Sequence, residues 1–497
     1  MTKSGRGWSM VLVGLLLAGA AVLLVAQGCD SGAGGGGGDD DVAVDGGGGG
    51  RDPFAALPDT AEGLTNVSTD LDAVLERGAL ADACTRWRAG GADRRTQLLC
   101  GKWMFFYEGF GTAGVPAVLP EVLIENFPDD IGPGFAKYGM VADPGSAKHL
   151  PLGMAPGAKL GNLDTLAFTC ASCHFARLPD GRYAVGAANH AYQYGKQNLA
   201  LAVFPLLAIM GSPADHDPDA IAAIQPLLDK VAADQALKLR LISALIPLAG
   251  ASSMVPMFPR EAEHHYARWP SGTMDFLIEP LPLNDRVHTI SKISALWGLP
   301  RDDERAATGM AGAQLGWTGS TSSLMVFLRG FVELGGGKLA EWPDDKLLPL
   351  AEYIYSLRTP ASLTPPPAAE VARGRALFDS AGCIACHDGP RGSGRRLYGF
   401  DEVGTDRAME QWLDGPGFMR PAIAEPLTRK VKSPRLTGAW AFTRFLHNGS
   451  VPSLEALLCL VPRAGVTETA YGDAGHDFGC ALPMAERQAL VSFLKGI

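Results

Sequence analysis

Positive charge is scarce in this sequence. Its 497 residues include 43 lysines and arginines against 53 aspartates and glutamates, which gives a formal net charge of −10. Proteins that bind nucleic acid need a surplus of positive charge to displace counterions from the phosphates. The charge balance therefore argues against a nucleic-acid partner.

Cysteine and histidine are also few, with 9 and 10 copies, so a repeated pattern of the two is informative. The sequence "CASCH" occurs at residues 170–174 and "CIACH" at residues 383–387. A chain of this composition is expected to contain roughly 0.003 copies of Cys-x-x-Cys-His by chance. Two copies are therefore a functional signal.

The Cys-x-x-Cys-His pattern is the attachment site of c-type haem. Two thiols add to the vinyl groups of the porphyrin, and the adjacent histidine gives a nitrogen to the iron. We therefore expect two covalently bound haem c groups, with iron ligands at His174 and His387, and with thioether links at Cys170, Cys173, Cys383 and Cys386. The alternative is a zinc site, but its Cys-x-x-Cys elements are typically paired, whereas these lie about 210 residues apart.

The N-terminus is typical of an export signal. Lys3 and Arg6 precede an apolar stretch at residues 8–26, and "QGC" ends at Cys29. This pattern favours a lipoprotein signal peptide over residues 1–28 with Cys29 lipidated, while an uncleaved membrane anchor is the alternative. Removing residues 1–28 takes away two positive charges and no acid, so the mature net charge is about −12.

Residues 29–59 are rich in glycine and aspartate and have almost nothing to bury, which predicts a disordered tether. We expect a membrane-anchored lipoprotein of the bacterial cell envelope, on the periplasmic side or the outer surface. An acidic surface suits a basic redox partner protein.

Four cysteines remain: Cys84, Cys100, Cys459 and Cys480. An exported protein keeps few free thiols, so two local disulfides, Cys84–Cys100 and Cys459–Cys480, would use all four. Four cysteines allow three connectivities, and the sequence leaves the choice open.

Helical periodicity and loop composition predict a mainly α protein with two cytochrome c-type haem domains and long irregular loops. The aromatic stretch "GKWMFFYEGF" is expected in a core, residues 219–248 as a helix or helical pair broken near Pro226, and residues 345–360 as a closing helix. These elements form an N-terminal haem domain at residues 60–362. After a proline-rich linker, residues 366–497 are expected to form a C-terminal cytochrome c domain whose first and last helices cross at Gly374.

Several segments together resemble a known family. They include "LPLGM", "RWPSGTMD", "GWTGSTSS", "FLHNGSVPSL" and "GHDFG", in addition to the two haem motifs. In this order they resemble the di-haem c-type cytochromes related to rubber oxygenase and, more distantly, bacterial di-haem cytochrome c peroxidases. The resemblance covers nearly everything from about residue 103 onward.

The resemblance implies a first haem that reacts with dioxygen or peroxide and a second haem held by two histidines. It places the second histidine in the Gly-His-acidic-aromatic-Gly loop, at His476. It also leads us to expect an arginine and an acid where this chain has Thr273 and Thr318, near the first haem, and these differences weaken the case for rubber as a substrate.

Three functions remain open: an envelope oxidoreductase with a reactive first haem and a bis-histidine second haem, a pure electron carrier with two six-coordinate haems, and a rubber-oxygenase-like dioxygenase. The sixth position of the first haem distinguishes them, and its candidates are His190, Met254, Met257, His264, His265 and Met274. At the second haem the rivals of His476 are Met419, Met484 and His447, of which His447 is better suited to hydrogen bonding beside the site.

Overall fold

The computed structural model describes residues 52–54, 57, 63–90, 93–209, 212–246, 260–275, 290–310, 315–319, 321–410, 429–467 and 471–497. The expected signal peptide, Cys29 and nearly all of the tether lie outside the described residues, as do Met254, Met257 and Met419. Among the helices in the described ranges, none combines the length and the apolar character needed to cross a membrane.

Two packed helices form the centre of the larger core. Helix α5 (Arg94–Tyr107) begins at Asp93, whose carboxylate accepts a hydrogen bond from the Thr96 amide, and it contains the expected aromatic stretch. Its Phe105 and Phe106 are fully buried. A Cβ atom at Gly101 would lie 2.0 Å from the Pro349 carbonyl oxygen, so glycine allows α5 to pack closely on α15 (Asp344–Ser356). The predicted aromatic core and closing helix are both confirmed.

Small antiparallel sheets join the helices of this part. β1 (Val67–Ser68), β6 (Tyr183–Val185) and β5 (Phe175–Arg177) form one sheet, and β2 (Val115–Pro116), β4 (Thr165–Phe168) and β3 (Met154–Pro156) form another. β7 (Thr273–Asp275) pairs with β8 (Ile290–Lys292). The further helices are α2 (Leu71–Leu75), α3 (Arg77–Leu80), α4 (Ala83–Arg88), α6 (Val118–Asn126), α7 (Cys170–His174), α8 (Tyr194–Asn198), α9 (Phe204–Ile209), α12 (Arg260–Arg268), α13 (Asp302–Ala307) and α14 (Leu324–Leu334), with shorter turns η1 (Pro133–Tyr138), η2 (Leu199–Val203), η3 (Pro213–Asp215) and η6 (Leu339–Glu341).

The expected helix break near Pro226 is wrong. Helix α10 (Pro218–Ala233) continues through Pro226, and the break comes at Asp234, which is extended and caps α11 (Gln235–Leu245). Pro226 lies on the exposed side of α10, where water can satisfy the carbonyl that loses its amide partner. Asp234 separates the two helices, because its carboxylate accepts a hydrogen bond from the Leu237 amide and so caps the start of α11.

The C-terminal part is built on two crossing helices, as expected. A Cβ atom at Gly374 on α16 (Ala368–Ser380) would lie 1.9 Å from the Ala489 carbonyl oxygen on α19 (Met484–Gly496). Phe378 and Phe493 pack with ring centroids 5.2 Å apart in the core between them. The other elements are η7 (Cys383–Ala385), η8 (Pro390–Gly392), β9 (Leu397–Gly399), α17 (Phe400–Val403), β10 (Lys430–Lys432), η11 (Ala439–Ala441) and α18 (Leu454–Leu457).

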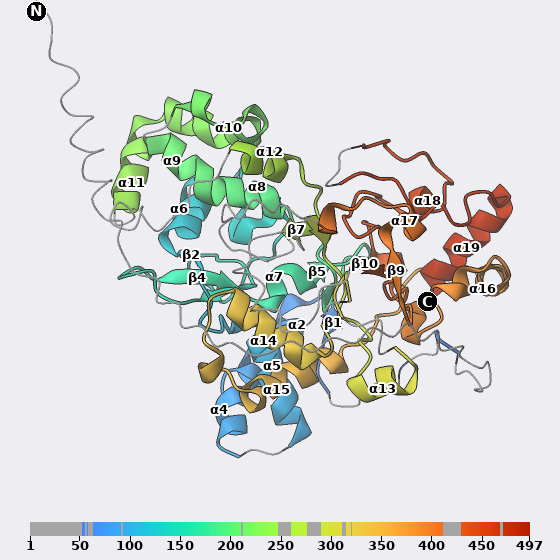
Figure 1. Ribbon diagram of the computed structural model, residues 1–497. Coiled ribbons are helices and arrows are strands. Elements are labelled where there is room, and N and C mark those ends of the chain that lie inside the picture. The colour runs from blue at the N-terminus through green and yellow to red at the C-terminus, as the bar shows by residue number, and fades with distance from the viewer. Residues whose placement is uncertain are drawn as a thin grey trace, which may run out of the picture.

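The protein is mainly helical, with small sheets between the helices (Figure 1). α16 and α19 lie side by side at one end of the molecule, while α10, α11 and α12 lie together away from them. The larger core also takes in Tyr471 and packs against Phe442, so chain segments from beyond residue 430 contact the N-terminal part.

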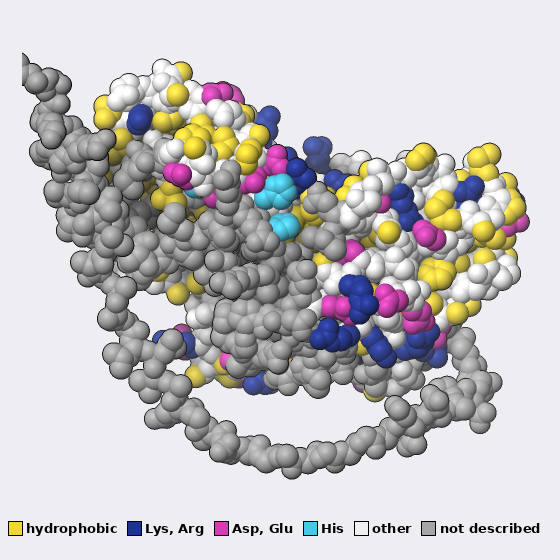
Figure 2. Space-filling view, turned by 45° about the horizontal axis from the view of Figure 1, so that its top comes forward, with side chains coloured by type: hydrophobic (Ala, Val, Ile, Leu, Met, Phe, Trp, Pro, Cys, Tyr) yellow, Lys and Arg dark blue, Asp and Glu magenta, His cyan; other side chains and the backbone are white. Residues whose placement is uncertain are grey.

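The surface of the C-terminal part carries both signs of charge. Figure 2 shows lysine and arginine side chains there among aspartate and glutamate side chains. Ion pairs such as Arg396–Glu402 and Arg407–Asp401 are exposed, and such pairs contribute little to stability.

Candidate functional site

The first Cys-x-x-Cys-His motif forms the short helix α7, between strands β4 and β5. The Ser172 hydroxyl donates a hydrogen bond to the Gly153 carbonyl and ties the helix to the loop before β3. Cys170 and Cys173 carry free thiols, and burial raises the pKa of both to about 12.

His174 ends α7 as a neutral imidazole. Burial lowers its pKa to about 4, against a smaller opposing effect of the Ser294 backbone. Its Nδ1 atom is buried without a hydrogen-bond partner among the described residues, although the side chain as a whole remains partly accessible. An unpartnered buried nitrogen needs an explanation, and the neutral form is the form in which histidine binds metals.

The second motif begins in η7 and ends at His387, which is buried. His387 Nδ1 donates a hydrogen bond to the Gly392 carbonyl oxygen at 2.6 Å, so Nε2 keeps its lone pair. Burial lowers the pKa of His387, so the ring stays neutral. A backbone carbonyl on the far nitrogen is the usual way in which a protein orients a metal-binding histidine.

His476 is brought close to His387, although 89 residues separate them in the sequence. Burial and, as the second cause, the positive charge that His387 would carry lower the pKa of His476 to about 4. Its Nδ1 atom is buried without a partner within the described ranges, while the ring remains partly accessible. Two neutral histidines that lie within electrostatic range of each other, each with a ring nitrogen left for a ligand, suit the two faces of one haem iron.

The backbone around His476 is unusual and tightly placed. His476 has a φ of 52°, and its amide donates to the Val403 carbonyl oxygen at 2.9 Å. Gly475 has a φ of 98°, and a Cβ atom there would lie 2.7 Å from the Thr405 Cα. The glycine is therefore required by the neighbouring chain at Thr405, and such left-handed residues often occur at functional sites.

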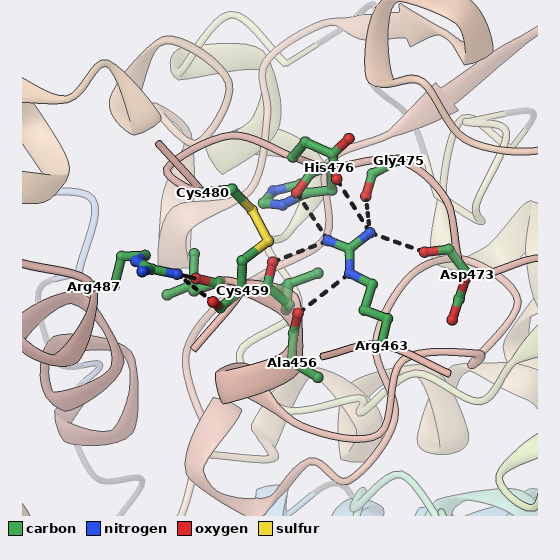
Figure 3. The surroundings of a disulfide bond; sticks show 11 residues. Ala456, Cys459, Arg463, Asp473, Gly475, His476, Cys480 and Arg487 are labelled. Atoms are coloured by element: carbon green, nitrogen blue, oxygen red, sulfur yellow. Dashed lines mark hydrogen bonds and ion pairs between the residues drawn. A yellow bond between two sulfur atoms is a disulfide. The ribbon is translucent and has the colours of Figure 1, made fainter. Parts of the chain in front are cut away.

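Arg463 holds this loop from below, and the sequence alone did not reveal it (Figure 3). Its guanidinium donates to the carbonyl oxygens of Gly475 at 2.7 Å and Asp473 at 2.9 Å. It also reaches the carbonyls of Leu457 and Ala456, at 3.1 and 3.3 Å, at the end of α18. The Arg463 side chain is only 13% exposed, so it joins α18 to the histidine loop through a largely buried set of hydrogen bonds.

Both disulfides expected from the sequence are present, namely Cys84–Cys100 and Cys459–Cys480. The second one closes the chain between the end of α18 and the turn before α19, beside Arg463 and His476 (Figure 3). Asp477, the acidic residue of this loop, places Oδ1 3.3 Å from Arg463 Nη1.

The rivals of His476 are less suitable ligands. Met484 is 63% exposed. His447 is buried, but its Nε2 lies 3.3 Å from Asp406 Oδ2 and its Nδ1 lies 3.4 Å from the Thr405 hydroxyl. His447 Nε2 makes no hydrogen bond within the described residues, but the Asp406 carboxylate beside it and the Thr405 hydroxyl beside Nδ1 favour a hydrogen-bonding role next to the loop over ligation.

The candidates for the sixth ligand of the first haem also differ in the contacts that their side chains make. Both nitrogens of His190 are occupied, because Nε2 lies 3.0 Å from the Ile293 carbonyl oxygen and Nδ1 accepts from the Thr443 amide at 3.1 Å. His264 lies 3.3 Å from an Asp217 oxygen, and His265 packs edge-on against it. Met274 alone among the described candidates contacts the motif, with its sulfur 3.7 Å from Cys173 Sγ.

The donor set fits covalent haem. In the described part of the chain, four cysteines form disulfides and four are free, and the free ones are the four of the two Cys-x-x-Cys-His motifs. Each motif histidine is neutral, with the far nitrogen of His387 already oriented by a carbonyl. These are the thiols and imidazoles that haem c attachment requires.

Comparison with known proteins gives one informative match. No curated protein matches the sequence. Among solved structures, a chain of hydrazine synthase from Kuenenia stuttgartiensis, pressurised with xenon, is 17% identical over 47% of this chain and 79% of that chain, with a TM-score of 0.29. A TM-score this low supports no shared fold. Residues 432–465 match the family described as RoxA-like, cytochrome c-like. The C-terminal part therefore contains a cytochrome c-like segment, and a cytochrome c-like domain implies covalently bound haem c.

Proposed function

We propose that the protein is a di-haem c-type cytochrome of the bacterial cell envelope, acting as an oxidoreductase. One haem would be attached in the part of the chain at residues 60–362 and the other in the part at residues 366–497. A lipid on Cys29 and the tether at residues 29–59 would hold both parts at the membrane. The match of residues 432–465 to a cytochrome c-like family supports a haem in the C-terminal part, and each attachment site rests on its own Cys-x-x-Cys-His motif.

The observation that carries the proposal is the pair His387 and His476. The two rings lie close enough for the charge of one to lower the pKa of the other, and each leaves a nitrogen available. A second haem held between them would be six-coordinate. Such a centre passes electrons with little rearrangement, which suits a relay.

The first site differs in the residues around it. His174 would hold the iron on one face, while the ring nitrogens of His190 are already taken by the backbone. When bound, the haems would supply one-electron chemistry and, at an iron face without a protein ligand, a site for dioxygen or peroxide. The chain's part is to attach the group at Cys170 and Cys173, to keep His174 neutral, and to exclude water with the surrounding core.

The test is a count of haems and of their ligand states. The mass of the mature protein should include two haems, and carbon monoxide added to the reduced protein should perturb about half of the haem absorbance. A mass with a single haem would remove the di-haem proposal. Full perturbation would show that His476 does not hold the second iron.

A pure electron carrier is the second candidate, and Met274 favours it. Its sulfur lies beside the first motif, at 3.7 Å from Cys173 Sγ, and a methionine on the open face would close the first haem. In that case carbon monoxide would leave both haems unchanged, and Met274→Leu would make one of them reactive. An open first haem would suit a small oxidant as the partner, and two closed haems would suit a basic redox protein.

A further inference from the structure

The interior between the two motifs contains positive charge without matching negative charge. Lys432, at the end of β10, is 7% exposed, and Arg305 on α13 is 6% exposed. Arg435 follows three residues after Lys432, and burial lowers its pKa to about 10. Burial also lowers the pKa of Lys432 to about 7, with Arg435 and Arg305 adding to the effect. Lys432 therefore lies close enough to Arg435 and Arg305 to be affected by the charge of both.

These cations have few partners in the described part of the chain. No carboxylate lies within ion-pair distance of Lys432 or Arg435 there, and Arg305 reaches only Asp302, at 3.7 Å. Two further nitrogens of Arg305, Nε and Nη1, are buried with no hydrogen-bond partner among the described residues. A buried ion without a counter-ion costs several kcal/mol, so this arrangement indicates an anion that completes it.

Neighbouring cations are either hydrogen-bonded to a carboxylate or placed over aromatic rings. Arg391 makes two hydrogen bonds to Glu304, and Lys292 lies over the rings of Trp317 and Phe442, 5.1 and 5.5 Å from their centroids. Lys432 makes no contact of either kind within the described residues.

The position of the cluster identifies its ligand. Arg435 donates to the carbonyls of Ala295 and Trp297, at 2.6 and 3.1 Å. The amide of Leu296, between them, donates to the Gly186 carbonyl at 2.8 Å, and the Gly186 amide donates to the His174 carbonyl at 2.7 Å. On the side of the second motif, the Ser433 carbonyl accepts from the Gly394 amide at 3.3 Å, two residues after Gly392, whose carbonyl accepts from His387 Nδ1. One short segment, residues 432–435, therefore lies beside the iron-binding histidines of both motifs.

We propose that Lys432, Arg435 and Arg305 form the binding site for the propionate carboxylates of the haems, so that one positively charged segment serves both haem sites. The inference rests on the proposed function, because it needs haem in the protein. Haem carries two carboxylates, and a buried cation beside it stabilises the reduced iron, which has one positive charge fewer.

The test replaces Lys432 by methionine, which is similar in volume but uncharged. Lys430 lies two residues earlier on β10, on the same face of the strand but exposed, so Lys430→Met is the matched control. Resonance Raman spectra of the haem-loaded full-length proteins should show a shifted propionate band in Lys432→Met and an unchanged band in Lys430→Met. At pH 6, where Lys432 is charged, the midpoint potential should be lower in Lys432→Met by at least about 59 mV, which is a tenfold change in the one-electron reduction equilibrium.

Thermal unfolding gives an independent readout, because a lysine paired with a haem carboxylate and an unpaired lysine predict changes of opposite sign in the midpoint temperature of Lys432→Met. If Lys432 pairs with a haem carboxylate, Lys432→Met leaves that carboxylate unpaired and lowers the midpoint temperature of the haem-loaded protein. A raised midpoint temperature with an unchanged propionate band would mean an uncompensated lysine, and would overturn the inference. Arg435 is tested in the same way with Arg435→Met, or with Arg435→Lys if the first variant does not fold. Arg435→Lys keeps the positive charge, so its propionate band should lie nearer to the wild-type position than the band of Lys432→Met does.

The two proposals fail in different ways. A wild-type mass without covalent haem overturns the proposed function, and this inference with it. Two attached haems with unchanged propionate bands in Lys432→Met overturn the inference alone.

Discussion

The Cys459–Cys480 disulfide should matter for the iron ligand as well as for stability. It closes a stretch of chain that contains both Arg463 and His476, and we expect it to hold the imidazole in place. The perturbation is the double substitution Cys459→Ala with Cys480→Ala. The matched control is Cys84→Ala with Cys100→Ala, which removes a disulfide of similar span from the larger core.

The loop lengths set the magnitude. The two disulfides have sequence separations of 21 and 16 residues. The loop-closure model then gives about 3 kcal/mol of stabilisation for each, through the entropy of the unfolded chain. Both double variants should therefore lose a similar free energy of unfolding. If the same restraint also holds His476, the equilibrium for its dissociation from iron should shift by up to about 100-fold in one variant only.

Two assays separate these effects. Urea unfolding of each variant measures the loss of stability. Carbon monoxide binding to the reduced protein and the electron paramagnetic resonance spectrum of the oxidised protein measure whether the second haem has lost its ligand. The variant without Cys459–Cys480 should show new carbon monoxide binding and a high-spin signal, and the control should show neither.

The reasoning is refuted if the two double variants behave alike in both assays. If both variants lose about 3 kcal/mol and neither changes the haem spectra, the disulfide stabilises the chain without restraining His476. Arg463 and the backbone at Thr405 would then be sufficient to position the ring.

Further substitutions test the rest of the site. His476→Ala should convert one low-spin haem into a form that binds carbon monoxide, while the control His447→Gln should keep both low-spin and high-spin populations unchanged; the reverse pattern in the spectra would make His447 the ligand. Arg463→Met should leave buried carbonyls without donors and lower the free energy of unfolding by about 3–5 kcal/mol in urea, with partial recovery in Arg463→Lys. An equal loss in both variants would show that the positive charge contributes nothing without the guanidinium geometry, and a loss below about 1 kcal/mol in Arg463→Met would contradict the role assigned to Arg463. Burial lowers the pKa of His190 to about 3, below its unfolded value of about 6.5. The stability that neutral His190 gives the folded state is therefore fully present above pH 6.5 and is lost as the pH falls toward 3. His190→Gln should therefore reduce the slope of stability against pH by about 1.4 kcal/mol per pH unit between pH 6 and 4, and an unchanged slope in urea titrations would contradict the assigned neutral state.

Much of the helical framework could be predicted, because its signals are local. The crossing of α16 and α19 follows from Gly374 and the apolar spacing of the last helix, and the aromatic stretch of α5 lies in the core as expected. The break in the α10–α11 region was misplaced at Pro226, because an exposed proline in a helix is tolerated when water takes the freed carbonyl.

The chemistry of attachment depends on five adjacent residues, and so the sequence determined it by itself: two thiols and a histidine at fixed spacing occur in "CASCH" and in "CIACH". Which nitrogens are available to a ligand depends on tertiary structure. His190 and His476 look alike in the sequence, yet one has both nitrogens occupied by backbone groups and the other has an unpartnered buried Nδ1 within the described part of the chain. The roles of Arg463 and Lys432 likewise appear only in the fold, because a hydrogen bond or a missing counter-ion is set by segments that lie far apart in the chain and meet only when it is packed.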